Sequence, residues 1–424
     1  MIAGSRPATP LPEPAPEPEA LGLYVHVPFC TSRCGYCDFN AYAGVDHLVP
    51  EYVEALVSEL GLWSAAARGQ RVVSVFFGGG TPSLLPLAEM ARIVEAIGTG
   101  YEVAAGAEWT LEANPTELTG EHLRGLADLG IGRLSMGVQS MHPEELALLD
   151  RQHTPERVEQ AVADARAAGF SSLNLDLIFG LPEQPLARWQ QSVERVLALG
   201  PDHLSCYALS VEPGTPLHYR VAKGEVPEPD PDDAAEQYEW VRDRLGRAGY
   251  AHYEISNWAR PGSECRHNLV YWRAEPYLGV GAGAHSYFRG RRFADVDAPN
   301  RYVESVRETL AERRESSRAQ MRQVASGETP SPEQERADAL ILGLRLREGI
   351  SDSGFRRRFG VSPADACGEA IRRHLASGLL EREGDVTRLS ERGLLLANEV
   401  FVDLLPEDAP APDPAPPRGH AAGA

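Results

Sequence analysis

Three cysteines lie close together near the start of the chain. Cys30, Cys34 and Cys37 share one short segment with CxxxCxxC spacing. Grouped thiolates of this kind bind zinc or an iron–sulfur cluster. A structural zinc site normally has four protein ligands. The other cysteines are isolated in the sequence: Cys206, Cys265 and Cys367. Three thiolates suit a cubane cluster whose fourth iron takes an outside ligand, and a chance grouping or a redox loop is the alternative.

A run of glycines is the second chemical feature. The segment FFGGGTP contains Gly78, Gly79, Gly80 and Thr81. It lacks the GK[ST] of a phosphate-binding loop and the GxGxxG of a dinucleotide-binding fold. Glycines after a strand allow backbone N–H groups to come close to a small polar ligand. A tight turn between a strand and a helix is the alternative, but the cysteine segment on a neighbouring strand favours ligand binding.

The elements that must position these residues alternate along the chain. Strand patterns occupy residues 21–29, 71–77, 107–115, 131–140, 171–182 and 202–210. Amphipathic helical patterns occupy residues 50–67, 85–98, 119–130, 154–169, 186–200 and 232–249. Pro50 suits the first turn of its helix, and Thr119 is an expected N-cap. Strands that alternate with helices predict βαβ units and a parallel sheet. Right-handed crossovers would wind six units into an incomplete parallel (β/α)6 barrel, an α/β fold.

Several polar residues stand where these strands end. Glu112 ends the third strand, Gln139 ends the fourth, and Asp176 lies within the fifth. The carboxyl ends of the strands of a parallel barrel meet at one rim, where binding and catalytic groups collect. A carboxylate within the apolar strand LNLDLIF is costly without a partner, which favours a functional role for Asp176. We therefore expect these groups to converge with the cysteines and the glycines.

Composition limits the classes of protein that this chain can represent. Its 424 residues suffice for a barrel and a smaller domain, and its formal charge of −20 argues against a general nucleic-acid binder. No segment approaches the roughly 20 apolar residues of a membrane span, and the N-terminus lacks a signal-peptide pattern. Six cysteines, three of them grouped, favour a reducing cytoplasm over a disulfide scaffold. The Pro-rich ends, residues 1–20 and 406–424, are expected to be disordered.

The motifs, taken in order, resemble the radical S-adenosylmethionine (radical SAM) superfamily. CxxxCxxC after the first strand and GGGTP after the second carry this resemblance. A longer series is similar to the oxygen-independent coproporphyrinogen III oxidase-like branch, and within it to a group of heme chaperones. That series is LYVHVPFCTSRCGYCDF, FGGGTPS, EANP, LSMGVQS and LNLDLIFGLP. The resemblance runs from about residue 21 to about residue 405.

This resemblance implies two cofactors. Cys30, Cys34 and Cys37 would bind three irons of a [4Fe–4S] cluster, and S-adenosylmethionine (SAM) would chelate the fourth iron. Reductive cleavage of SAM to a 5′-deoxyadenosyl radical is then the chemistry that the cofactors supply. The same resemblance implies that further residues bind SAM: Tyr24, Tyr36, Gly79, Gly80, Thr81, Glu112, Gln139, Arg151 and Asp176. A surface ion pair is the alternative for Arg151, since surface arginines are common.

Two features separate the chaperone group from the oxidase. The oxidase pattern continues as CxxxCxxCxC, whereas this chain has Asp38 and Phe39 after the third cysteine, which is the CxF of the chaperone group. The segment CRHNLVYWR contains HNxxYW, beginning at His267, and is similar to the heme-associated motif of that group. His267 would then be an axial heme ligand, since imidazole is a common one. A structural histidine is the alternative, and His285 in GVGAGAHSY is a second candidate.

The C-terminal part of the chain reads as a separate unit. We expect a barrel core at residues 21–255, the HNxxYW segment and a linker at 256–332, and a small domain at 333–405. Two helices and a short β pair that ends in TRLSERG predict a helical, winged-helix-like fold for that domain. Such a domain would contact a partner or a substrate, or it would cover the open barrel.

Three functions remain open from the sequence. The first is a heme chaperone that carries the cluster and an exchangeable SAM and transfers heme to an acceptor protein. The alternative is an oxygen-independent coproporphyrinogen III oxidase, and the third is a zinc-stabilised barrel without radical chemistry. The implied partners are heme, a heme-acceptor protein and an electron donor such as a flavodoxin or ferredoxin. We expect no nucleic acid among the partners and a cytoplasmic location. Any association with a membrane would be peripheral and would occur through a partner.

Overall fold

A curved sheet forms the centre of the protein, whose computed structural model describes residues 19–315 and 320–406. The strand order of this sheet is β14-β13-β12-β11-β1-β4-β5-β6-β7-β8-β10-β9. Six neighbouring strands are parallel: β1 (Glu19–Val27), β4 (Gln70–Gly79), β5 (Glu102–Ala113), β6 (Arg133–Gln139), β7 (Ser172–Phe179) and β8 (His203–Ala208). β1 and β8 are not paired with each other, so the barrel is open. The predicted incomplete (β/α)6 barrel is therefore confirmed.

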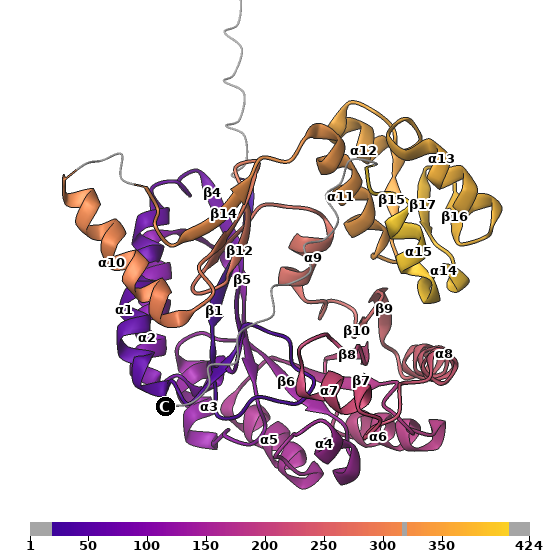
Figure 1. Ribbon diagram of the computed structural model, residues 1–424, viewed down its shortest axis with the longest axis horizontal. Helices are drawn as coiled ribbons and strands as arrows, with labels where there is room; N and C mark the ends of the chain where they lie inside the picture. The colour runs from indigo at the N-terminus through magenta and orange to yellow at the C-terminus, as the bar shows by residue number, and fades with distance from the viewer. Residues whose placement is uncertain (1–18, 316–319, 407–424) are drawn as a thin grey trace, which may run out of the picture.

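Helices connect the parallel strands and cover the outer face of the sheet (Figure 1). They are α1 (Val49–Ser64), α2 (Leu87–Gly100), α3 (Gly120–Asp128), α4 (Pro143–Leu148), α5 (Pro155–Ala168), α6 (Leu186–Ala198), α7 (Pro216–Ala222) and α8 (Pro231–Arg247). α1 buries Tyr52, Val53, Leu56 and Leu60, the spacing of one helix face. Thr119 caps α3 as expected, because its side chain accepts a hydrogen bond from a backbone N–H of the first turn.

Short elements shape the segments at the rim of the barrel. The cysteine segment begins with β2 (Phe29–Cys30), which pairs with β3 (Tyr42–Ala43). Two 3₁₀ turns lie beside these segments: η1 (Asp46–Leu48) and η2 (Pro82–Leu84). Among the described residues, no helix is long and apolar enough to cross a membrane.

The sheet extends beyond the barrel on both sides. β9 (Ala251–Glu254) and β10 (Asn257–Ala259) lie at the β8 edge. At the β1 edge lie β11 (Tyr277–Val280), β12 (His285–Phe288), β13 (Arg291–Asp295) and β14 (Val324–Glu328). Two helices accompany them: α9 (Arg266–Trp272) and α10 (Pro299–Glu315). The segment 256–332, expected to hold the HNxxYW motif and a linker, thus also contains five strands and two helices among its described residues. β14 was missed because its side chains are mostly exposed and only backbone pairing with β13 makes it a strand.

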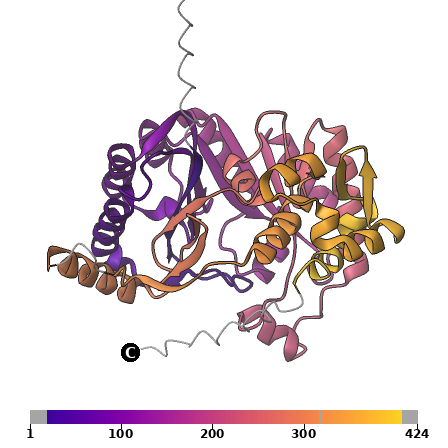
Figure 2. The ribbon, with the colours of Figure 1, turned by 90° about the horizontal axis from the view of Figure 1, so that it is seen from above.

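The C-terminal residues form a separate lobe. It contains α11 (Pro332–Leu344), β15 (Ile350–Ser351), α12 (Asp352–Phe359), α13 (Pro363–Ala376), β16 (Leu380–Glu383), β17 (Val386–Leu389), α14 (Glu391–Leu395) and α15 (Ala397–Val402). Helices followed by the β16–β17 hairpin give the expected winged-helix-like order, with β15 as an additional third strand. Figure 2 shows this lobe lying beside the barrel, and α11 packs against α9. Most of the two predicted disordered ends lies outside the described residues, but Glu19 and Ala20 belong to β1.

Candidate functional site

The carboxyl ends of the parallel strands surround a cavity of about 440 Å³, which we call the inner cavity. Most of the residues predicted for the cluster and for SAM line this one cavity: Cys30, Cys34, Tyr36, Cys37, Gly79, Gly80, Thr81, Glu112, Gln139, Arg151 and Asp176. Tyr24 and His267 do not line it. The convergence follows from the parallel register, since Gly137 of β6 is paired with Asp176 of β7.

The three thiols lie at the mouth of the inner cavity. Cys30 Sγ is 3.5 Å from Thr81 Oγ1, and Arg151 donates a hydrogen bond to Cys34 Sγ at 3.4 Å. Burial raises the pKa of Cys30, and it raises the pKa of Cys37 to about 11. Thiolate ligation must therefore displace protons. Within residues 19–315 and 320–406, no three His, Cys, Asp or Glu side chains are grouped to hold a single metal ion.

The backbone of the glycine segment is bonded differently from the expectation. The N–H of Gly79 donates to Glu112 Oε2 at 3.2 Å. The N–H groups of Gly80 and Thr81 donate to backbone carbonyls within residues 27–29, each at 2.8 Å. In this conformation these N–H groups have partners inside the protein, and ligand binding by the glycine segment stays a prediction. Carbonyl oxygens are the backbone groups that this segment offers to a ligand with N–H donors.

Three polar side chains in the inner cavity have buried atoms without hydrogen-bond partners, those of Arg133, Gln139 and Arg151. Gln139 ends β6 with φ of +66°, a conformation that is uncommon outside glycine, and its Oε1 has no hydrogen bond. Arg151 donates to the carbonyl oxygen of Gly137 at 2.6 Å, while its Nε has no acceptor. Arg151 forms no ion pair among the described residues, so the surface ion pair that the sequence allowed is not formed. Buried polar atoms without partners indicate a site for a polar ligand.

Two carboxyl groups face the same cavity. Burial, together with the charge of Asp176, raises the pKa of Glu112 to about 7. Burial also raises the pKa of Asp176, although hydrogen bonds from Ser205, Asn174 and Ser135 oppose that rise. Asn174 donates to Asp176 at 2.7 Å. Asp176 thus has the partners that its place in an apolar strand requires.

A row of buried polar residues on the inner face of the barrel was missed from the sequence. Its members are Arg133, Ser135, Asn174, His203 and Ser205. Asn174 donates to Ser135 at 2.8 Å, and His203 Nδ1 lies 2.6 Å from Asn174 Oδ1. The signal was present in the sequence, because every second residue is polar in RLS, SLNLD and HLS. A period of two places these side chains on one face of the sheet.

His267 is a buried structural residue in this conformation. Its side chain is 1% exposed, Nδ1 is 2.9 Å from Ser74 Oγ, and Nε2 is 2.8 Å from the Tyr271 hydroxyl. Burial and the charge of Arg133 lower the pKa of His267 to about 3. Both ring nitrogens are thus occupied, and axial ligation of a heme iron would break one of these hydrogen bonds. The contacts favour the structural alternative in this conformation, and the ligand role of His267 stays a prediction.

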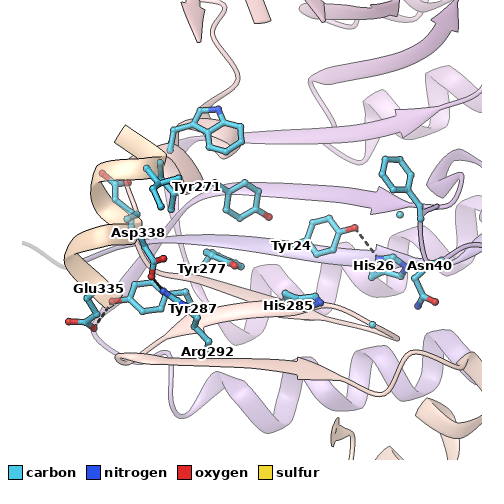
Figure 3. A pocket seen from close by; sticks show the side chains of 18 of the residues that line it. Tyr24, His26, Asn40, Tyr271, Tyr277, His285, Tyr287, Arg292, Glu335 and Asp338 are labelled. Carbon is cyan, nitrogen blue, oxygen red and sulfur yellow. Dashed lines mark hydrogen bonds and ion pairs between the residues drawn. The ribbon is translucent and has the colours of Figure 1, made fainter. Parts of the chain in front are cut away.

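A second cavity, of about 670 Å³, is shown in Figure 3. We call it the aromatic cavity. Its aromatic lining is Tyr24, Phe39, Tyr271, Trp272, Tyr277 and Tyr287. The two cavities share four lining residues: Asp38, Phe39, Gly79 and Glu112. α9 stands between them, since Asn268 lines the inner cavity while Tyr271 and Trp272 line the aromatic cavity.

Comparison with known proteins assigns this architecture. A model of the radical SAM superfamily matches residues 24–196, and a model of the HemN C-terminal domain matches residues 331–396. A Mycobacterium tuberculosis protein named heme chaperone HemW is 40% identical over 399 residues, covering 93% of this chain and 97% of that protein. Heme chaperone HemW from Bacillus subtilis is 35% identical, covering 91% and 99%. The structure of coproporphyrinogen III oxidase (HemN) from Escherichia coli, titled a radical SAM enzyme, aligns with a TM-score of 0.78 at 25% identity and covers 92% and 91%.

An open parallel barrel with CxxxCxxC at its rim, matched in this way, defines a radical SAM protein. Within that superfamily, the chain belongs to the HemW family. The resemblance seen in the sequence is therefore confirmed, both for the superfamily and for the chaperone group.

Proposed function

We propose that this protein is a heme chaperone that carries a [4Fe–4S] cluster and an exchangeable SAM. The observation that carries the proposal is the pair of adjoining cavities. One has three cysteines and unpaired polar atoms, and the other has a wide aromatic lining. Phe39 stands at their junction with 62% of its surface exposed, in the place of the cysteine that continues the oxidase pattern. The names of the HemW relatives support the same function.

The residues of the inner cavity fit the two cofactors. Cys30, Cys34 and Cys37 would hold three irons, which leaves one iron for SAM. When bound, the cluster supplies the electron and SAM supplies the reactive carbon–sulfur bond. Gln139 Oε1 and Arg151 Nε provide an unused acceptor and an unused donor for the polar groups of SAM.

The remaining proposed SAM residues act around these atoms. Tyr36 lies within the cysteine segment and Thr81 lies beside it, while Glu112 and Asp176 supply carboxyl groups to the cavity. Tyr24 lines the aromatic cavity, and its hydroxyl is 3.0 Å from His26 Nδ1. We therefore propose that Tyr24 separates SAM from the second cavity and does not bind SAM directly.

Transfer of heme requires partners that the chain does not contain. We propose that the protein is cytoplasmic, that a heme-acceptor protein receives the heme, and that an electron donor such as a flavodoxin or ferredoxin supplies the electron to the cluster. The excess of acidic residues does not favour nucleic acid as a partner.

A second function has support from one comparison. The HemN structure aligns along nearly the whole chain, so the barrel would also suit decarboxylation of coproporphyrinogen III to protoporphyrinogen IX. Phe39 in place of the additional cysteine favours the chaperone. The two functions differ in an observable way, since a chaperone releases the porphyrin unchanged.

The cluster and the heme transfer can be tested separately. After anaerobic reconstitution, we expect about one [4Fe–4S] unit per chain, and its loss when Cys30, Cys34 and Cys37 are all changed to Ala. Cys367→Ala is the matched control, because Cys367 lies in the C-terminal lobe. Unchanged iron and sulfide content in the triple variant would reject the cluster ligands.

Heme transfer is measured with the heme-loaded protein and apomyoglobin as a probe acceptor. We expect the absorption spectrum of holomyoglobin to develop while the porphyrin remains heme by chromatography. Retention of all the heme in the presence of excess apomyoglobin would argue against the chaperone.

A further inference from the structure

The aromatic cavity has the size and the lining that a flat, largely apolar macrocycle needs. Most of its walls come from the strands β1 and β11 to β13, the helix α9, and the lobe helices α11 and α12, and the segment after the cysteines, β4 and β5 complete them. Its volume lies in the range of about 300–1,000 Å³ that small-molecule sites occupy. Aromatic side chains provide broad faces for stacking against a conjugated ring.

His285 presents an imidazole to this cavity. It begins β12, and its side chain lies against the cavity in Figure 3. Its ring has no hydrogen-bond partner among the described residues, and burial lowers the pKa of His285, which keeps the ring neutral near pH 7. Two other histidines lie near. His26 lies 3.0 Å from the Tyr24 hydroxyl and 2.9 Å from the Asn40 carbonyl oxygen, and His267 is buried with both nitrogens bonded. A neutral imidazole with an unshared nitrogen is the form that ligates iron.

Arg358 also lines the aromatic cavity and offers a cation to the propionates of a heme. Arg358 of α12 donates to the carbonyl oxygens of Arg273 and Ala274 at 2.8 Å and 2.5 Å. It forms no ion pair with a carboxylate among the described residues. The other lining arginine, Arg292, is already paired with Asp338. Glu275 and Glu335 add negative charge to the same lining, so a carboxylate ligand there requires Arg358.

The turn that carries His285 is fixed to the cysteine segment. The side-chain amide of Asn40 donates to the carbonyl oxygens of Ala282 and Asp297 at 3.0 Å and 2.8 Å. The same turn has no room for a side chain at Gly283, because a Cβ there would lie 2.5 Å from the Asn40 amide nitrogen. A ligand on His285 would therefore lie beside the segment that ends in Phe39.

We infer that the aromatic cavity binds heme, with His285 as the axial iron ligand and Arg358 as the partner of a propionate. This inference rests on the proposed function and adds the location and the ligand. The HNxxYW motif then contributes through Tyr271 and Trp272, which form one wall, while His267 positions Tyr271 through its hydrogen bond.

The test is a titration of the anaerobically reconstituted full chain with ferric heme, followed by absorption spectroscopy. His285→Ala should shift the Soret band and weaken heme binding about tenfold or more. Added imidazole should restore the parental spectrum, because it can occupy the vacated ligand position. His47→Ala is the matched control, since His47 is exposed on η1 and lines neither cavity. His285→Met, which keeps a thioether that can ligate iron, should bind heme with a spectrum of its own.

A second variant tests the site without touching the iron ligand. Arg358→Gln should weaken heme binding several-fold and leave the Soret band in place, and unchanged affinity would remove the arginine from the site. If the parent protein binds heme and His285→Ala shows the same spectrum and affinity, the ligand assignment is wrong while the chaperone function stands. If the parent binds no heme, the proposed function and the heme site both fail.

Discussion

Position 80 requires a glycine because backbone atoms of the protein itself leave no room there for a Cβ. A Cβ at this position would lie 2.6 Å from the carbonyl oxygen of Phe29 and 2.8 Å from the carbonyl carbon of Pro28, both backbone atoms of the segment that leads into Cys30. Gly80→Ala should therefore displace that segment, destabilise the protein by about 1–3 kcal/mol and lower its iron content after reconstitution.

A second glycine provides the control for this substitution. Gly98 lies exposed in α2 with nothing near its missing side chain, so Gly98→Ala should be neutral or stabilising by up to about 1 kcal/mol. Thermal unfolding and iron analysis measure both effects. If Gly80→Ala kept the stability and iron content of the parent protein, the clash with the backbone would be contradicted.

Glu112 gives the protein a pH dependence of known sign. Its pKa of about 7 in the folded chain is above its ordinary value. Protonated Glu112 therefore stabilises the folded state at low pH, and this stabilisation is lost as pH rises through 7. Without cluster and SAM, the free energy of unfolding should fall between pH 5 and pH 8 more steeply in the parent than in Glu112→Gln. The difference should be at most about 1.4 kcal/mol per pH unit. Denaturant titrations at four pH values measure it, and parallel curves would contradict the shifted pKa.

Site residues within distinctive motifs could be predicted from the sequence, whereas single polar residues outside such motifs could not. The cysteine and glycine segments could be placed together because parallel strands end at one rim. The hydrogen bonds of His267 could not be predicted, because a sequence does not show which groups bond a histidine ring, and here Ser74 is distant in the chain. Asn174 and His203 went unnoticed because single polar residues gain meaning only when neighbouring strands place them in one row.

At the scale of elements, Glu59 of α1 fixes the turn between β11 and β12. This fully buried carboxyl group accepts hydrogen bonds from the N–H of Gly281 at 2.9 Å and the hydroxyl of Tyr302 at 2.5 Å. Burial and the charge of Glu59 hold the pKa of nearby Asp295 well above its ordinary range, so Asp295 stays protonated.

Removal of this group should loosen the turn that carries His285. Glu59→Ala leaves buried donors without an acceptor, so the free energy of unfolding should fall by about 2–4 kcal/mol. Glu54→Ala on the same helix is the control, because Glu54 is exposed, and it should change stability by less than about 0.5 kcal/mol. Equal stabilities of the two variants in urea would contradict the anchoring role of Glu59.

The central strands could be predicted, whereas the added ones could not. β1, β6 and β7 are largely buried, β4 alternates over part of its length, and β5 is buried towards its end, so their sequences carry a pattern. β2, β3 and β15 are two residues long, too short for any periodicity. β12 and β13 follow a glycine-rich turn, and their place beside β11 depends on pairing between segments that local sequence does not specify.

At the scale of the whole molecule, the C-terminal lobe closes one side of the aromatic cavity. The Tyr287 hydroxyl donates to Glu335 of α11 at 3.0 Å, and Arg292 is paired with Asp338 of the same helix. A ligand held between the sheet and the lobe should therefore stabilise both.

Hydrogen exchange can detect this closure. On addition of heme, amide exchange should slow in α11 and in β12 to β13, and it should remain unchanged in α3, which lines neither cavity. Peptide-resolved mass spectrometry measures these segments in one experiment. Protection confined to the barrel, with none in α11, would place the heme elsewhere.

The central claim is that this protein carries heme and does not make it. One anaerobic preparation with its cluster intact should be given heme in one portion, and coproporphyrinogen III with SAM and a strong reductant in another. We predict about one heme bound per chain and no protoporphyrinogen IX formed. Steady formation of protoporphyrinogen IX without uptake of heme would contradict the claim and would make the protein an oxidase.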